Sequence, residues 1–256
     1  MHKENFLNKD FDWKCYRRKS DTAYRKAYLT GNKELVKPHN IIKNGGIELN
    51  FALDLAKLYF GTTPAKGKAL DVGCGGGYMT SCLKEFGFEA VGFDISEEAI
   101  ALAKKSFPEI TYFVGNGVTP KEYFNRPQFD LIFLREFHPF TRIDSFDDQR
   151  KIIEDYLDIL NENGIVIISH SRRIIIQGRK SNTLDYRKVK RYFQRSTIQN
   201  AGPIYFGLHK KLRISPKYKM VTKILSILTG IVSSVIVYPR TGGGLIEFFL
   251  IYKSVG

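Results

Sequence analysis

The sequence predicts an α/β protein with a doubly wound, mostly parallel sheet of seven strands that closes with a C-terminal antiparallel hairpin. Two observations predict this class. Between Lys68 and residue 170, short apolar runs of strand length alternate with stretches of helical period. A glycine-rich loop follows the first of these runs, at the position where a sheet of this kind binds its ligand. Because helices separate the strands, the connections are crossovers and the strands are expected to lie parallel.

The expected elements follow one another at short intervals. Apolar residues at helical spacing predict a first helix over residues 46–59, which Gly61 and Pro64 end. The parallel strands are expected at residues 69–72, 89–93, 110–114, 129–134 and 165–169. The helices between them are expected at residues 78–86, 96–106 and 147–160, the second of them with Ser96 as its N-cap.

The last third of the chain has a weaker periodicity. Two further helices are expected over residues 184–199 and 220–228. The closing hairpin is expected to pair residues 232–238 with residues 246–252, across the turn Thr-Gly-Gly-Gly at 241–244. This antiparallel pair would complete the sheet.

The length of 256 residues suits one large domain with a buried core. We expect residues 67–256 to form this domain, including a basic helical insertion at about 172–223, and residues 1–66 to form a helical extension or a lid over the site. The N-terminus has no apolar stretch of the signal-peptide type, and the three cysteines have neither disulfide-framework nor zinc-site spacing. These features predict a reducing, cytoplasmic compartment and no bound metal.

The net charge of +14 is concentrated in one segment. Residues 172–223 contain fifteen Lys or Arg and a single acid, Asp185. Such a segment favours an anionic or phosphorylated partner, which includes RNA, a nucleotide-linked or lipid-linked sugar and an anionic membrane surface. The alternative is a solvated basic face that aids solubility. Residues 224–238 are apolar but shorter than the roughly 20 residues of a membrane-spanning helix, so we expect a core segment, with peripheral membrane contact as the second interpretation.

The loop after the first strand carries the pattern D-x-G-x-G-x-G from Asp71 to Gly77. Glycines let the main chain turn tightly and approach a ligand closely, and the following helix begins with unpaired N–H groups. A dinucleotide fingerprint would need a third glycine at Tyr78, so the spacing differs from that motif. Asp94, at the end of the second strand, is positioned to accept hydrogen bonds from two ribose hydroxyls. Asp71 is expected to hold the loop or to reach an ammonium group.

At these residues the chain resembles the class I S-adenosylmethionine-dependent methyltransferases. Segments similar to the family's motifs occur in order and at the expected spacing over about a hundred residues. They are the first motif at 68–78 (KALDVGCGGGY), the second at 90–96 (AVGFDIS), the adenine-contacting turn at 113–117 (FVGNG), the fourth strand at 130–134 and the fifth-strand segment at 160–169. The resemblance implies a Rossmann-like fold, S-adenosyl-L-methionine as cofactor and methyl transfer as activity.

The resemblance also implies roles for individual residues. Gly73, Gly75 and Gly77 would lie along the methionine and ribose of the cofactor, with Asp94 on the ribose hydroxyls. Ile95 would pack on the adenine face. Asn116 stands where the family usually has an Asp that accepts a hydrogen bond from the adenine amino group; its amide oxygen can still accept, so the resemblance implies binding that is retained but weakened.

Candidate catalytic residues follow the fourth strand. His138 is suited to take a proton from an acceptor hydroxyl, and Glu136 to orient His138 or to contact the methionine ammonium group. The alternative is that His138 is a structural residue of its turn. The sequence lacks the Asp/Asn-Pro-Pro-aromatic motif typical of family members that methylate exocyclic amines of nucleic-acid bases. It also lacks a Pro-Cys nucleophile for methylation of cytosine at carbon 5, and a metal-ligand cluster for a catechol-type mechanism. These types of methylation are therefore disfavoured.

These features favour methyl transfer to a hydroxyl, or to an amine, of a small or medium anionic acceptor such as a glycan precursor or another metabolite. The basic segment at 172–223 would hold the negative charge of the acceptor. One alternative is an RNA methyltransferase in which Tyr186, Tyr192 and Phe193 stack on bases. Another is a partner subunit that binds the cofactor without catalysis. The sequence does not predict the oligomeric state.

Overall fold

The structure is a computed structural model that describes residues 38–141, 143, 145–172, 184–212, 214–235 and 245–255. Three features expected from the sequence lie wholly or partly outside these residues: the N-terminal extension before Pro38, residues 173–183 of the basic segment, and the turn at 241–244.

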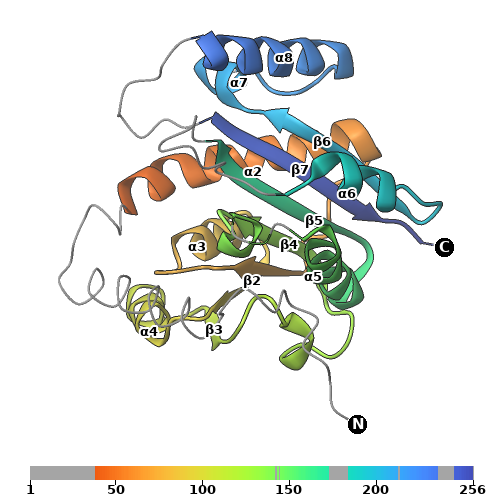
Figure 1. Cartoon of the computed structure of the whole chain (residues 1–256). Helices are drawn as coiled ribbons and strands as arrows, with labels where there is room; N and C mark the ends of the chain where they lie inside the picture. The colour runs from red at the N-terminus through yellow and green to blue at the C-terminus, as the bar shows by residue number, and fades with distance from the viewer. Residues whose placement is uncertain are drawn as a thin grey trace.

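The sheet has seven strands in the order β3-β2-β1-β4-β5-β7-β6 (Figure 1). Five strands are mutually parallel, namely β1 (Lys68–Val72), β2 (Glu89–Asp94), β3 (Thr111–Val114), β4 (Phe129–Arg135) and β5 (Leu160–Arg172). Strand β7 (Leu245–Lys253) is antiparallel to both β5 and β6 (Ile198–Tyr205). The expected doubly wound sheet with a final antiparallel pair is confirmed. The strand order reverses at β1, which has β2 on one side and β4 on the other, so the loops after these strands meet at a ligand-binding switch point.

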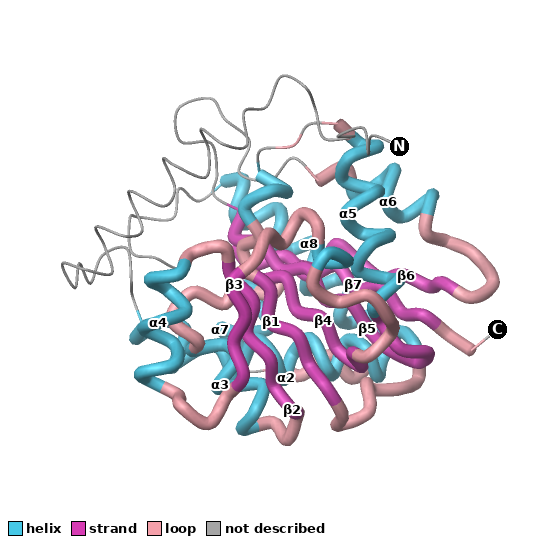
Figure 2. The backbone as a smooth tube through the Cα atoms, turned by 90° about the horizontal axis from the view of Figure 1, so that it is seen from below, coloured by secondary structure: helices cyan, strands magenta, loops and turns pink. Residues whose placement is uncertain are grey.

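Helices cover both faces of the sheet. Helices α2 (Pro38–Phe60) and α3 (Tyr78–Glu85) pack on one face, and α5 (Phe146–Ile159) and α6 (Tyr186–Tyr192) on the other (Figure 2). Strand β5 serves both cores, because Ile165 and Ile167 point to the first face while Val166 and Ile168 point to the second. Helix α4 (Glu97–Ser106) packs against β2 and β3. The loops after β1, β2 and β4 are therefore connected to a sheet that helices cover on both faces.

The helix starts follow local sequence signals. Ser96 caps α4 by accepting a hydrogen bond from the Ala99 N–H at 3.2 Å, as the sequence predicts. Glu97 and Glu98 occupy the first turn, where the helix dipole favours acids. Two short 3-10 helices, η1 (Pro120–Glu122) and η2 (His138–Thr141), follow β3 and β4.

The closing hairpin was wrongly placed by the sequence. Residues 232–235 belong to helix α8 (Lys219–Val235), and the antiparallel partner of β7 is β6. Strand β6 was not predicted, because Gly202 and Pro203 interrupt its sequence and the alternation of its apolar residues is weak. Proline is tolerated there because β6 is the edge strand, whose outer N–H groups need no strand partner.

The helix expected over residues 184–199 is likewise shorter than predicted. It ends at Tyr192, and β6 begins at Ile198. The segment at 172–223 is therefore not wholly helical, since it contributes an edge strand to the sheet before α7 (Gly207–Leu212) and the start of α8. Figure 1 shows α7 and α8 beside β6, at the edge of the sheet opposite β3.

Candidate functional site

The glycine loop folds back onto the end of β2. The Gly73 N–H donates a hydrogen bond to the Phe93 carbonyl at 2.7 Å, and the Cys74 N–H shares that carbonyl at 3.2 Å. The φ angles of Gly73, Gly75 and Gly77 are 72°, 52° and 82°, a region that residues with a Cβ rarely adopt. The loop is thus fixed against the strand that carries Asp94.

Two glycines of the loop have different surroundings. A Cβ placed on Gly73 would meet no atom within 4 Å, and this residue is exposed. A Cβ placed on Gly77 would lie 2.5 Å from the hydroxyl oxygen of Tyr112 on β3. Gly77 is therefore required for packing at the start of α3, whereas the main chain at Gly73 is open to a ligand.

Asp94 joins the loop to the start of α4. Its Oδ2 accepts a hydrogen bond from the Gly75 N–H at 2.8 Å, and its Oδ1 accepts one from the Ser96 N–H at 2.9 Å. A carboxylate has about four acceptor sites, so Asp94 can hold the loop and also accept hydrogen bonds from hydroxyl donors of a ligand. The structure brings together the two motifs that the sequence singled out.

Asp71 lies beneath the loop and is 1% exposed. Its Oδ2 accepts a hydrogen bond from the Thr80 hydroxyl of α3 at 2.7 Å. Burial raises the pKa of Asp71 to about 7, while the Thr80 hydrogen bond and the charge of Arg135 oppose this shift. The hydrogen bond fastens α3 to β1. Sequence reasoning did not single out Thr80, because nothing local marks it as the partner of Asp71.

The residues expected around the adenine lie at the ends of β2 and β3. Ile95 is half-buried directly after β2. Asn116, after β3, uses Oδ1 to accept a hydrogen bond from the Val118 N–H at 3.1 Å. The next residue, Gly117, accepts a hydrogen bond through its carbonyl from the Tyr156 hydroxyl of α5 at 2.6 Å. The turn is thus held from the α5 side, and its residues lie at the same edge of the sheet as the glycine loop.

The candidate catalytic residues lie at the end of β4. Glu136 has a φ of 51° although it is not a glycine, and its N–H donates to the Ser169 carbonyl at 2.8 Å. A left-handed conformation costs roughly 1–2 kcal/mol for such a residue, and strain of this kind is typical of functional positions. The Glu136 side chain is 37% exposed. His138 starts η2 two residues later and is exposed.

A histidine that the sequence analysis missed lies beside Glu136. His170 is on β5, and its Nδ1 is 3.9 Å from Oε2 of Glu136. Its ring is buried, and within the described structure neither ring nitrogen has a hydrogen-bond partner. Glu247 of β7 is the register partner of His170, so the imidazole lies at the level of two carboxylates on the face covered by α5 and α6. The available signal was a titratable residue directly after the apolar run of β5.

Arg135 forms an ion pair that the sequence also did not reveal. Its Nε lies 2.8 Å from Oε2 of Glu48 on α2, and Nη2 lies 3.4 Å from Oε1. The Glu48 side chain is 2% exposed and that of Arg135 is 20% exposed. This two-pronged contact fixes α2 to the end of β4, directly before Glu136.

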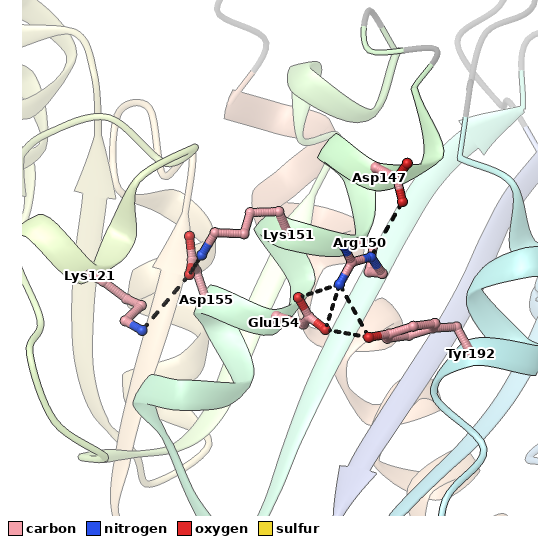
Figure 3. Close-up of polar contacts among 7 residues, drawn as sticks. All are labelled: Lys121, Asp147, Arg150, Lys151, Glu154, Asp155 and Tyr192. Atoms are coloured by element: carbon pink, nitrogen blue, oxygen red, sulfur yellow. Dashed lines mark hydrogen bonds and ion pairs between the residues drawn. The ribbon is translucent and has the colours of Figure 1, made fainter. Parts of the chain in front are cut away.

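The aromatic residues expected to stack on RNA bases are engaged within the protein. Phe193 is 1% exposed. The Tyr192 hydroxyl donates to Glu154 at 2.8 Å, and the guanidinium groups of Arg150 and Arg195 lie 5.1 and 4.7 Å from the centre of its ring. Figure 3 shows Tyr192, the last residue of α6, beside Arg150 and Glu154 of α5. The Tyr186 hydroxyl lies 3.0 Å from a Glu247 carboxylate oxygen. In this structure Phe193 is not presented to a base.

Comparisons with known proteins agree with this geometry. A family model described as "Methyltransferase domain" matches residues 48–201. The chain is 30% identical over 106 residues to the ubiquinone biosynthesis O-methyltransferase of Pelagibacter ubique, covering 40% of this chain and 41% of that protein. It is 46% identical over 44 residues to the protein of the same name from Methylococcus capsulatus, covering 17% of this chain and 19% of that one. The matches thus span about two fifths or less of these relatives.

Solved structures match over nearly the whole chain. The plantazolicin methyltransferase BamL, crystallised with a triazolic desmethylPZN analog and SAH, has a TM-score of 0.57 at 16% identity, covering 94% of this chain and 99% of that one. An S-adenosylmethionine-dependent methyltransferase from Clostridium acetobutylicum has a TM-score of 0.56 at 13% identity, covering 91% and 100%. At these identities the likeness shows the shared fold.

Proposed function

Because this chain belongs to the methyltransferase-domain family, we propose that it uses S-adenosylmethionine to methylate a hydroxyl group of a small or medium anionic acceptor. The observation that carries this proposal is the position of Glu136, a strained and partly exposed carboxylate at the end of β4, with His170 behind it. A carboxylate at this edge can accept the proton that a hydroxyl must lose as it becomes methylated. The names of the two curated relatives, both O-methyltransferases, support oxygen as the acceptor atom.

We propose that the predicted loop residues hold the cofactor. The open main chain at Gly73 and the Asp94 carboxylate, which lies against the loop, fit a ligand with ribose hydroxyls. Gly75 would lie beside that ribose, Ile95 and Asn116 would line the adenine, and Gly77 and Asp71 would shape the loop from below. When bound, S-adenosylmethionine supplies an electrophilic methyl group, so the protein mainly aligns the acceptor and removes its proton.

The proposed base is Glu136, and His170 is a positioning residue. Its buried ring lies behind the Glu136 carboxylate, with Nδ1 3.9 Å from Oε2, and so keeps that carboxylate directed toward the acceptor. His138 is the alternative base, since it is exposed at the same rim. Separate variants of these three residues distinguish the two assignments.

Helix α6 supports an anionic acceptor. Tyr186 in its first turn contacts Glu247, the register partner of His170, so α6 begins on the face of the sheet that carries His170. The exposed basic residues of α6 are Arg187, Lys188, Lys190 and Arg191. A negative group on the acceptor would be attracted to this end of the molecule.

The experiment is a methyl-transfer screen with purified protein, S-adenosylmethionine and matched pairs of acceptors. Each pair shares a ring or sugar and differs in one feature, hydroxyl against amine or carboxylate against carboxamide. Formation of S-adenosylhomocysteine is the readout. We expect turnover with hydroxylated anionic members. Turnover restricted to amines would contradict the hydroxyl assignment, and turnover restricted to RNA would contradict the small acceptor. Cofactor binding without turnover across the panel and RNA would support a non-catalytic partner subunit and contradict the proposal.

A further inference from the structure

Helix α8 has its polar residues inside and its apolar residues outside. The exposed apolar side chains are Met220 (72%), Val221 (42%), Ile224 (50%), Ile227 (52%) and Leu228 (43%). Their spacing places them on one side of the helix. On the opposite side, Thr222, Ser226 and Thr229 are buried. A surface helix of a water-soluble domain normally shows the reverse arrangement.

The buried polar side chains of α8 form hydrogen bonds with the main chain of neighbouring elements. Ser226 Oγ accepts a hydrogen bond from the Tyr205 N–H of β6 at 3.0 Å. Thr229 Oγ1 accepts one from the Leu208 N–H of α7 at 3.1 Å and donates to the Leu225 carbonyl at 2.7 Å. Side chains of α8 thus satisfy one main-chain N–H group of the edge strand and one of α7. The helix is attached through hydrogen bonds, which leaves its apolar side directed away from the protein.

Three more exposed apolar residues precede α8 in the sequence. Leu212, Ile214 and Tyr218 are 53%, 39% and 70% exposed. We call the five exposed residues of α8 the α8 face. Single exposed apolar residues are common on proteins, but five on one side of one helix indicate an interaction surface.

The charges around the α8 face identify its occupant. Residues 207–235 contain six Lys or Arg and no Asp or Glu. Lys217, Lys219 and Lys223 are exposed, and the Lys219 ammonium lies 5.6 Å from the centre of the Tyr59 ring. An apolar face flanked by lysines is typical of helices that lie in the surface of an anionic membrane. Pairing of two copies through this face would bring these lysines together and is disfavoured by like-charge repulsion.

We propose that α8 docks this protein onto the surface of an anionic lipid membrane. The helix lies in the plane of the surface, with Met220, Ile224 and Ile227 in the acyl-chain boundary and the lysines at the phosphates. No helix in the described part of the chain is long and apolar enough to cross a bilayer, which fits peripheral contact. The inference goes beyond the proposed methyl transfer and does not depend on the identity of the acceptor.

The orientation of α8 relates this surface to the site. Its first residue, Lys219, contacts Tyr59 near the end of α2, the end from which the chain enters β1. The next strand, β7, begins at Leu245 opposite Arg172, at the carboxyl end of β5. Helix α8 therefore starts near the edge of the sheet opposite to the one that carries the glycine loop.

The test is flotation of the full chain with vesicles of pure phosphatidylcholine and of phosphatidylcholine mixed with phosphatidylglycerol, at low and high salt. The first variant, Ile224→Ser/Ile227→Ser, removes two side chains of the α8 face. The second, Lys219→Glu/Lys223→Glu, reverses two of its flanking charges. The control, Ile47→Ser/Val255→Ser, removes two equally exposed apolar side chains outside α8.

We expect the wild type and the control to bind anionic vesicles and to bind neutral vesicles at least about tenfold more weakly. The serine variant should lose affinity by about tenfold or more, and the glutamate variant by roughly fivefold per lysine at low salt. Unchanged melting temperature and unchanged S-adenosylmethionine binding would show that the variants are folded. Absence of wild-type binding, or equal binding by the serine variant, would overturn the proposal. A dimer that only the serine variant disrupts, without vesicle binding, would assign the face to a second copy and also overturn it.

Discussion

Nδ1 of His170 lies 3.9 Å from the carboxylate of Glu136, across the neighbouring ends of β5 and β4. The pair lies at the edge of the sheet where the chain turns out of β1 into the glycine loop. A buried imidazole behind a partly exposed carboxylate is suited to hold a proton acceptor in place. This relationship assigns different roles to two residues that a sequence motif would not connect.

The first prediction concerns this pair. Glu136→Gln should lower kcat for a hydroxyl acceptor by about 10²–10⁴-fold, because the amide cannot accept the proton, with cofactor affinity little changed. His170→Asn should lower kcat less, because the proposed base remains and only the ring behind it is lost. His138→Asn is the matched control. If His138→Asn caused the large loss and Glu136→Gln did not, the base would be His138.

The second prediction contrasts two glycines of the loop. Gly77→Ala should lower the free energy of unfolding by about 2–4 kcal/mol, because the new Cβ meets the Tyr112 hydroxyl at 2.5 Å and φ is 82°. Gly73→Ala has the φ cost without the clash and should lose only about 1–2 kcal/mol. Urea unfolding measures both. Tyr112→Phe removes the clashing oxygen and should restore part of the stability of Gly77→Ala; equal losses for the two alanines would contradict this account.

The third prediction is a pH dependence of stability caused by Asp71. The pKa of Asp71 is about 7 in the folded protein and 3.8 for an unperturbed aspartate. Between pH 3.8 and about 7, the folded state therefore keeps a proton on Asp71 that the unfolded state has released. Stability from this group is therefore present below about pH 4 and is lost as pH rises toward and through 7. Relative to Asp71→Asn, the wild type should lose stability from pH 4.5 to 7.5 in urea unfolding. A constant difference across this range would show that burial does not raise the pKa of Asp71.

The fourth prediction tests the ion pair between α2 and β4. Glu48→Gln should lower the free energy of unfolding by about 3 kcal/mol, because it leaves the mostly buried Arg135 guanidinium without its carboxylate. Lys84→Gln, which removes a pair between exposed side chains of Lys84 and Glu109, serves as the control and should change stability by less than about 1 kcal/mol. Thermal and urea unfolding measure both. Comparable losses would show that the buried pair has no special weight.

The sequence predicted the parallel half of the sheet because its signals are local. Short apolar runs, the Ser96 cap and the glycine loop lie within a few residues of the structures that they specify. It misplaced the edge because β6 lacks a buried alternating pattern and contains Pro203. The end of α8 was predicted as a strand. Its apolar side faces outward and its polar side inward, which is the reverse of the pattern expected for a surface helix.

The candidate site divides in the same way. Asp94 and the loop glycines could be predicted, because a motif marks them within one segment. The pairings of Asp71 with Thr80, of Arg135 with Glu48 and of Glu136 with His170 could not. Each joins different elements through packing of the whole fold, which the sequence pattern alone does not encode.

The most direct test of the central claim is calorimetric titration of S-adenosylmethionine into the wild type and into Asp94→Ala. The control variant is Asp130→Ala. Asp130 lies at the start of β4, and its carboxylate accepts a hydrogen bond from the Lys68 N–H at 2.9 Å. We expect binding by the wild type and by the control, and a loss of at least about tenfold in Asp94→Ala, because one carboxylate holds the loop and offers acceptors to the ribose. Folded wild-type protein that binds no S-adenosylmethionine, or an Asp94→Ala variant that binds it as well as the wild type does, would contradict the account.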